Sequence, residues 1–227
     1  RLVSSKKTRY ILPNILTLSG VCCGISSIKF SIEQNFSLAV ILIILASILD
    51  ALDGRIARLI KGTSEFGKEL DSLTDFVSFG IAPALIIYFW DLKNYGKIGW
   101  LLILIFSVCC VLRLARFNLN SEEKNNGWKI NYFEGIPAPA GGILILIPLI
   151  FELSELKLIF EINKITPFLI IIISVLMISK IPTFSLKKIS IKKNYTIFIM
   201  LFIGVIIVSL IFFTFETVLF ISTIYLL

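Results

Sequence analysis

The chain has 227 residues, of which 57% are hydrophobic, and its formal net charge at pH 7 is +7. The hydrophobic share exceeds the roughly 45–50% that is usual for soluble globular domains. The excess lies in runs of Ile, Leu and Phe that are too long for strands and too apolar for one-faced helices, which excludes a soluble fold. The sequence has no basic stripe interleaved with aromatic residues, which argues against nucleic-acid binding. The positive charge instead suits an anionic membrane surface.

Eight apolar runs follow one another along the chain, and they predict an all-α integral membrane protein. A transmembrane helix needs about 20 apolar residues. The predicted helices cover residues 11–30, 36–60, 69–91, 98–117, 136–152, 165–180, 195–213 and 214–227. The last two are hard to separate and the final one is short, so seven and eight spans both fit. A basic segment over residues 1–10 lies either along the membrane surface or in solvent.

The basic residues are distributed unequally between the two ends of the predicted spans. With a cytoplasmic N-terminus, 17 of the 22 Lys and Arg residues fall on the cytoplasmic side and five on the other side. Cytoplasmic loops of membrane proteins carry such an excess. We therefore predict a multi-pass protein of the cell (inner) membrane with its N-terminus in the cytoplasm. The last two runs contain no Lys or Arg, so this argument does not extend to them.

Four aspartates stand in two pairs around the turn between the second and third predicted helices. Asp50 and Asp53 are three residues apart, and Asp71 and Asp75 are four residues apart. Both spacings place a pair on one face of a helix. The short turn at residues 61–67 makes the two helices antiparallel neighbours, so we expect all four carboxylates at one depth near the cytoplasmic end.

Such a group of carboxylates needs positive charge to be stable. Two of them about 5 Å apart repel by roughly 3 kcal/mol at an effective dielectric constant near 20. The chain contains no histidine, and oxygen ligands alone select hard divalent cations, Mg²⁺ or Mn²⁺ with Ca²⁺ also possible. Such cations bridge phosphate oxygens during phosphoryl transfer. Gly54, Ala57 and Gly67 leave room beside the carboxylates for a pyrophosphate and a nucleotide.

Two other interpretations of the aspartates remain open. In the first, the aspartates form buried ion pairs with Arg55, Arg58, Arg113 or Arg116. Such pairs would account for a single buried aspartate better than for four aspartates in two helical pairs. A cation-coupled transporter would usually spread its acidic groups through the depth of several spans, whereas these gather at one end.

The aspartate segment resembles the signature of the CDP-alcohol phosphatidyltransferase family, D-x2-D-G-x2-A-R-x8-G-x3-D-x3-D. Every fixed position is matched, by Asp50, Asp53, Gly54, Ala57, Arg58, Gly67, Asp71 and Asp75. The resemblance implies a six-helix membrane core, usually dimeric, with its metal site at the cytosolic face. That core would cover residues 11–190, and residues 191–227 would add one or two C-terminal transmembrane helices.

The resemblance also implies roles for individual residues. Asp50, Asp53 and Asp71 would hold the metal with the CDP pyrophosphate. Asp75 would be the base that takes the proton of the acceptor hydroxyl, and it can also bind a second metal. The expected nucleotide-binding set is Asn14, Thr17, Asp50, Asp53, Gly54, Ala57, Arg58, Gly67 and Asp71.

The stretches around the signature are similar to those of the membrane-embedded phosphatidylserine synthases within this family. They extend from about residue 11 to residue 190 and include residues 13–17, 77–84, 113–118 and 133–140. The resemblance implies CDP-diacylglycerol as the donor, L-serine as the acceptor, and phosphatidylserine and CMP as products. The same transfer to glycerol 3-phosphate or inositol is the alternative.

Two further pairs of polar residues lie near the predicted cytoplasmic end. Arg113 and Arg116 can bind the lipid phosphate or the serine carboxylate, or can serve only to anchor their helix. Asn14 and Thr17 can hydrogen-bond the nucleotide or its phosphates, or can be satisfied within the start of the first helix.

Overall fold

A computed structural model of the chain describes residues 11–60, 62, 64–122, 132–155, 162–179, 182–184 and 196–226. The basic segment at residues 1–10 and the predicted boundary near residue 190 lie outside the described residues. The described part is helical except for one pair of three-residue strands and the connecting turns. It therefore agrees with the predicted all-α membrane fold, with the strand pair as an addition.

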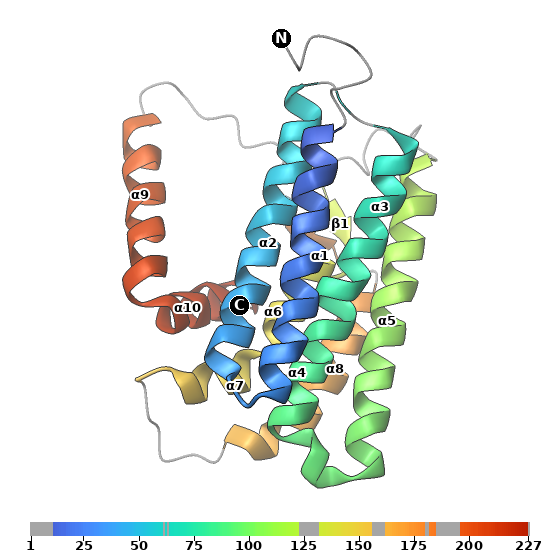
Figure 1. Ribbon diagram of the computed structural model, residues 1–227, viewed down its shortest axis with the longest axis vertical. Helices are drawn as coiled ribbons and strands as arrows, with labels where there is room; N and C mark the ends of the chain where they lie inside the picture. The colour runs from blue at the N-terminus through green and yellow to red at the C-terminus, as the bar shows by residue number, and fades with distance from the viewer. Residues whose placement is uncertain are drawn as a thin grey trace.

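Four helical stretches in the described part are long and apolar enough to cross a membrane. They are α1 (Ile11–Ile32), α2 (Phe36–Leu59), the stretch Glu65–Trp90, and α5 (Lys97–Glu122). The first four predicted spans are thus confirmed as helices. The ends of α2, of the stretch Glu65–Trp90 and of α5 that carry most of their basic residues lie at the end of the bundle where α1 starts (Figure 1). The basic residue of α1 itself, Lys29, is in its last turn, at the opposite end.

The third stretch is not a regular helix. It consists of α3 (Glu65–Asp75), a π-helical turn called η2 (Phe76–Ile81), and α4 (Ala82–Trp90). It begins four residues before the predicted start, because the Ser64 hydroxyl accepts a hydrogen bond from the Gly67 backbone N–H at 3.0 Å and caps the helix. π-helical turns are rare in proteins, and many of those that occur lie at functional sites.

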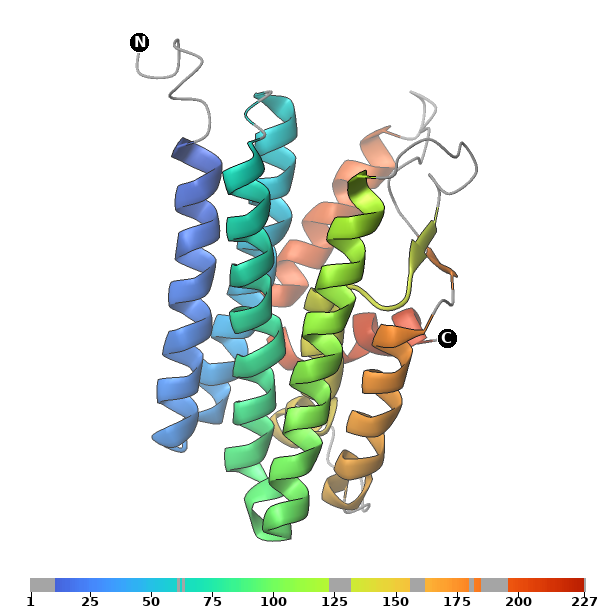
Figure 2. The ribbon, with the colours of Figure 1, turned by 90° about the vertical axis from the view of Figure 1, so that its right-hand side faces the viewer.

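The fifth predicted span is divided into two short helices. These are α6 (Ala138–Ile145) and α7 (Ile147–Leu153), with an interruption at Leu146. Pro148 has no backbone N–H and therefore cannot continue the hydrogen-bond ladder from α6. The sixth span is present as α8 (Thr166–Ile178), which packs against α5 and α6. Across Figure 2, α1, the α3–α4 stretch, α5 and α8 follow one another.

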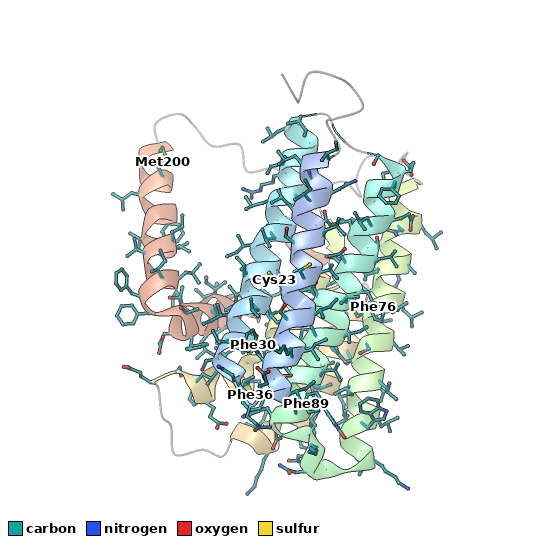
Figure 3. The ribbon with its side chains drawn as sticks, viewed as in Figure 1. Cys23, Phe30, Phe36, Phe76, Phe89 and Met200 are labelled. Atoms are coloured by element: carbon teal, nitrogen blue, oxygen red, sulfur yellow. The ribbon has the colours of Figure 1, made fainter. Side chains whose placement is uncertain are left out.

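The two C-terminal helices differ in orientation from each other. They are α9 (Thr196–Phe212) and α10 (Thr214–Leu226), with a bend at Phe213 between them. In Figure 1, α9 stands apart from the bundle while α10 turns inward toward it, crosswise to the long helices, and α10 packs against α7. The labelled side chain of Met200 marks the far end of α9 in Figure 3. Helix α10 is about 20 Å long, which is shorter than a hydrocarbon core of about 30 Å.

The strand pair joins two segments that are far apart in the sequence. Strand β1 (Tyr132–Glu134) runs antiparallel to β2 (Pro182–Phe184). Gly135 follows β1 with a φ of 77°, and a Cβ atom there would lie 2.7 Å from the backbone oxygen of Met177. Only glycine tolerates that conformation at that distance, so Gly135 allows the chain to pass close to the end of α8.

Close packing around η2 fixes its position in the bundle. A Cβ atom on Gly24 of α1 would lie 2.9 Å from the Cα atom of Ser78, and one on Gly142 of α6 would lie 3.0 Å from the backbone oxygen of Phe79. Small residues of this kind let helix backbones approach in membranes. The π-helical turn is therefore held between α1 and α6.

Candidate active site

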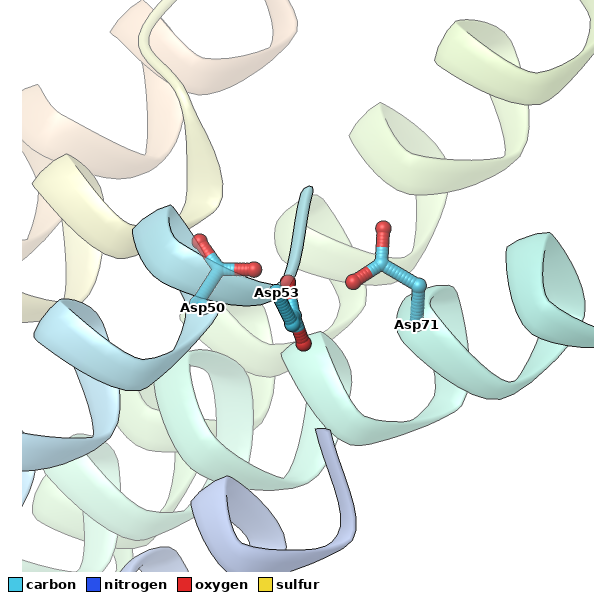
Figure 4. A group of neighbouring side chains, drawn as sticks. All are labelled: Asp50, Asp53 and Asp71. Atoms are coloured by element: carbon cyan, nitrogen blue, oxygen red, sulfur yellow. The ribbon is translucent and has the colours of Figure 1, made fainter. Parts of the chain in front are cut away.

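Three of the four aspartates meet between α2 and α3. One carboxylate oxygen from each of Asp50, Asp53 and Asp71 lies within 4.8 Å of the others. Figure 4 shows the three side chains converging from the two helices. Asp53 is buried and the other two are half-buried. The structure thus brings together the carboxylates as their spacing predicts, while metal binding by them stays a prediction.

The fourth aspartate adjoins this group on the side toward the interior. The carboxyl groups of Asp75 and Asp50 are close enough to interact electrostatically. Together with Asp53 they line a small cavity of about 10 Å³, which is roughly the space of one water-sized sphere. The other lining residues are Thr17, Gly20, Ala46, Thr74, Ser78 and Phe79.

The oxygen atoms of this cluster fit a hard divalent cation. Such cations bind oxygen at about 2.1 Å for Mg²⁺ and about 2.4 Å for Ca²⁺, so ligands on opposite sides are about 4–5 Å apart. The three aspartate oxygens span a similar distance. Carboxylates are also the ligand type that such ions prefer. Asp50, Asp53 and Asp71 would therefore hold the ion, with Asp75 beside it.

The buried ion pairs considered as an alternative are not found in the described part of the chain. The ion pairs there link Lys29 to Glu33 and Lys68 to Glu65, on the surface. The side chains of Arg55 and Arg58 are exposed. The aspartates are therefore not neutralised by these two arginines.

The glycine that follows Asp53 borders open space. A Cβ atom built on Gly54 would have no heavy atom within 4 Å. Ala57, one turn further along α2, is half-buried. On the facing helix, a Cβ atom on Gly67 would lie 3.1 Å from the Ser64 hydroxyl and 3.3 Å from Asn14 Oδ1. Of the two glycines in the signature, Gly54 therefore borders free space, whereas Gly67 is needed for packing between α1 and α3.

The two residues predicted on α1 have different surroundings. Asn14 is half-buried beside the start of α3, where its side chain faces Gly67. Thr17 is buried, and its hydroxyl contacts Asp53 Oδ2 at 2.5 Å and the backbone oxygen of Pro13 at 3.0 Å. The structure therefore places Thr17 against a carboxylate of the cluster, where its hydroxyl is already engaged.

The two arginines of α5 also separate into different environments. The Arg113 guanidinium lies near the carboxyl groups of Asp75 and Asp50 and is stacked 5.6 Å from the centre of the Phe117 ring. Arg116 Nη1 donates a hydrogen bond of 2.6 Å to the backbone oxygen of Ile178 at the end of α8. Arg113 therefore faces the site, and Arg116 ties α5 to α8.

Sequence reasoning missed some residues around the site. Ser78 and Phe79 of η2 line the cavity. Ser78 follows Asp75 by three residues, and that helical spacing was a usable signal. Tyr225 of α10 lies near Arg113. No sequence pattern indicated this neighbour, because the crosswise path of α10 alone brings it there.

Comparisons with known proteins agree on one family. A sequence model described as CDP-alcohol phosphatidyltransferase matches residues 10–226. The protein named CDP-diacylglycerol–serine O-phosphatidyltransferase of Mycobacterium tuberculosis is 37% identical over 186 residues, which cover 82% of this chain and 65% of that protein. The protein of the same name from Helicobacter pylori is 37% identical over 194 residues, with 86% and 79% covered. The archaetidylserine synthase of Methanothermobacter thermautotrophicus is 36% identical over 191 residues, with 79% and 73% covered. The matched region is thus slightly less than two thirds of the mycobacterial protein.

Proposed function

The chain belongs to the CDP-alcohol phosphatidyltransferase family, and from this premise we propose that it transfers a phosphatidyl group from CDP-diacylglycerol to the hydroxyl group of L-serine. The products are phosphatidylserine and CMP. The observation that carries the proposal is the convergence of Asp50, Asp53 and Asp71 within 4.8 Å, with Asp75 lining the same small cavity as Asp50 and Asp53. The names of the relatives from three organisms support serine as the acceptor.

Three aspartates would hold a divalent cation, Mg²⁺ or Mn²⁺, at the donor site. Asp50, Asp53 and Asp71 would supply its oxygen ligands from α2 and α3, where these two helices meet. When bound, the cation offsets the negative charge of the pyrophosphate oxygens. The free space at Gly54 admits the nucleotide beside α2, and the exposed Arg58 lies one turn beyond it. The two acyl chains remain in the inner leaflet, from which the donor enters laterally.

Asp75 acts as the general base. It accepts the proton of the serine hydroxyl while the hydroxyl oxygen forms a bond to the phosphorus that carries diacylglycerol. The bond from that phosphorus to the bridging oxygen breaks, and CMP leaves with this oxygen. The chain contains no histidine that could form a covalent intermediate, so a single displacement is favoured. Holding the base beside the bound phosphates supplies the proximity that such a step requires.

Arg113 binds the serine carboxylate or the lipid phosphate. Its guanidinium lies near Asp75 and Asp50, so an anion bound there is close to the base. A guanidinium group can bind a carboxylate or a phosphate through two parallel hydrogen bonds. Arg116 is less suited to that role because one of its donors is used by Ile178. We place the site at the cytoplasmic face of the cell membrane and expect a homodimer.

The test is incubation of the purified protein in detergent with CDP-diacylglycerol and labelled serine, with Mg²⁺ or Mn²⁺ or with a chelator. Labelled phosphatidylserine and an equal amount of CMP should form only when the cation is present. Parallel reactions with glycerol 3-phosphate and inositol test the acceptor, and a preference for either would replace serine. No cation-dependent CMP release with any acceptor would refute the proposal and leave cation-coupled transport as the rival.

A further inference from the structure

One hydroxyl group of the first helix contacts the aspartate cluster. Thr17 lies on α1, is 6% exposed, and is separated in sequence by 36 residues from Asp53 of α2. Its Oγ1 atom is 2.5 Å from Asp53 Oδ2 and 3.0 Å from the backbone oxygen of Pro13. A hydroxyl group has one proton, and a charged acceptor binds it more strongly than a neutral one. Thr17 therefore donates chiefly to the Asp53 carboxylate.

We propose that Thr17 is a positioning residue that orients the Asp53 carboxylate toward the divalent cation, in place of the nucleotide contact expected from the sequence. The proposal rests on the proposed function only in taking Asp50, Asp53 and Asp71 as the cation ligands. A carboxylate whose one oxygen is held by Thr17 keeps its other oxygen for the ion. In Figure 4 the two oxygens of Asp53 point in opposite directions, between Asp50 and Asp71.

The position of Thr17 is itself fixed by the packing of α1. The contact with the Pro13 oxygen, one turn earlier, selects the side-chain rotamer of a β-branched residue. Further along the helix, the backbone oxygen of Gly20 accepts a hydrogen bond of 3.3 Å from the Ser78 hydroxyl, and Gly24 packs against the same serine. The first helix thus holds both Asp53 and the π-helical turn that follows Asp75. Its role is to set the relative positions of the two carboxylate pairs.

Cation affinity measured without substrate tests this role directly. Mn²⁺ binding to the purified protein in detergent is followed by electron paramagnetic resonance, for wild type, Thr17→Val and Thr17→Ser. Loss of a group that hydrogen-bonds a metal ligand typically costs about 10–100-fold in affinity. We expect the Mn²⁺ Kd of Thr17→Val to rise by that factor, and Thr17→Ser, which keeps the hydroxyl, to stay within about threefold of wild type.

A matched control lies on the same helix. The Ser19 hydroxyl donates to the backbone oxygen of Ile15 at 2.8 Å, two residues along the chain from Thr17. Ser19→Ala removes a hydroxyl from the same helix without touching the cluster, so its Mn²⁺ Kd should equal that of wild type. Thermal unfolding in the presence of a chelator shows whether each variant folds. Thr17→Ala is a second hydroxyl-free variant, and it should show the same loss of affinity if Thr17→Val does not fold.

Three results would overturn the proposal. The first is an Mn²⁺ Kd for the hydroxyl-free variants within twofold of wild type. The second is Mn²⁺ binding by Thr17→Ser that is as weak as that of Thr17→Val. The third is that Thr17→Val lowers the Mn²⁺ affinity by the same factor when Asp53 is already replaced by Asn. The outcome is separate from that of the transfer assay. Wild type that binds Mn²⁺ but releases no CMP refutes the proposed function alone, whereas transfer with unchanged Mn²⁺ binding in Thr17→Val refutes the positioning role alone.

Discussion

Replacing Gly24 by alanine should disturb the site from a distance, through the contact between α1 and η2. The added Cβ would lie 2.8 Å from Ser78 Oγ and 2.9 Å from Ser78 Cα. The hydroxyl can rotate away, but the Cα atom belongs to a backbone that Gly142 of α6 holds from the other side. Carbon atoms in contact are normally at least about 3.5 Å apart, so the two helices must separate by about 0.6 Å.

The expected change in stability of Gly24→Ala is the difference between two opposing contributions. Overpacking of a well-packed interior costs about 1–3 kcal/mol, and alanine is more favourable than glycine within a helix by about 1 kcal/mol. The net loss of stability is therefore up to about 2 kcal/mol, which lowers the apparent Tm of a chain of this length by up to about 8 °C. A displacement of 1 Å can cost about 100-fold in rate. The smaller shift of the turn after Asp75 should therefore lower the transfer rate by roughly 10-fold.

Thermal unfolding in detergent and the CDP-diacylglycerol transfer assay measure the two effects. The matched control is Gly204→Ala on α9, where a Cβ atom would meet no heavy atom within 4 Å. That variant should be as stable as wild type or slightly more so, and equally active. The reasoning is wrong if Gly24→Ala and Gly204→Ala give the same Tm and the same rate.

Three further substitutions test the site and its surroundings. Asp75→Asn keeps the shape of the side chain but removes the base, so transfer should fall by at least about 100-fold while Mn²⁺ binding and thermal unfolding change little; normal turnover would exclude Asp75 as the base. Arg113→Ala should raise the KM for serine or for CDP-diacylglycerol with little change in Tm. Arg116→Ala, which breaks the hydrogen bond to Ile178, should instead lower stability by about 1.5–3 kcal/mol and leave both KM values unchanged. The reverse pattern for the two arginines would contradict the assignment.

Local patterns predicted the features that depend on local sequence. The runs of apolar residues located the helices, and the spacing of Asp50, Asp53 and Asp71 predicted their convergence, since helical periodicity and a short turn leave few alternatives. The start of α3 after Ser64, four residues before the predicted start, could have been predicted, because serine is a favoured helix cap. The interruption at Leu146 could also have been predicted, because Pro148 cannot donate a backbone hydrogen bond.

Tertiary packing decided the rest. The partners of Thr17 and Arg116 are Asp53 and Ile178, which lie 36 and 62 residues away. Polar side chains near a predicted site look alike in the sequence, whether they bind a ligand, another side chain or a helix end. The crosswise path of α10, which brings Tyr225 near Arg113, likewise depends on its contacts with α7. Length and hydropathy carry no information about that direction.

The π-helical turn divides the third membrane helix into two segments. The face that each segment turns toward its neighbours is therefore set independently of the other. Asp71 and Asp75 precede the turn and face α2, while Phe79 sits within it against α6. Each residue of a regular helix advances the face by about 100°. Deleting one residue between positions 76 and 81 would restore regular winding and swing one segment by about that angle. Insertions and deletions at this point therefore change which face of the helix meets α2 far more than they change the length of the span.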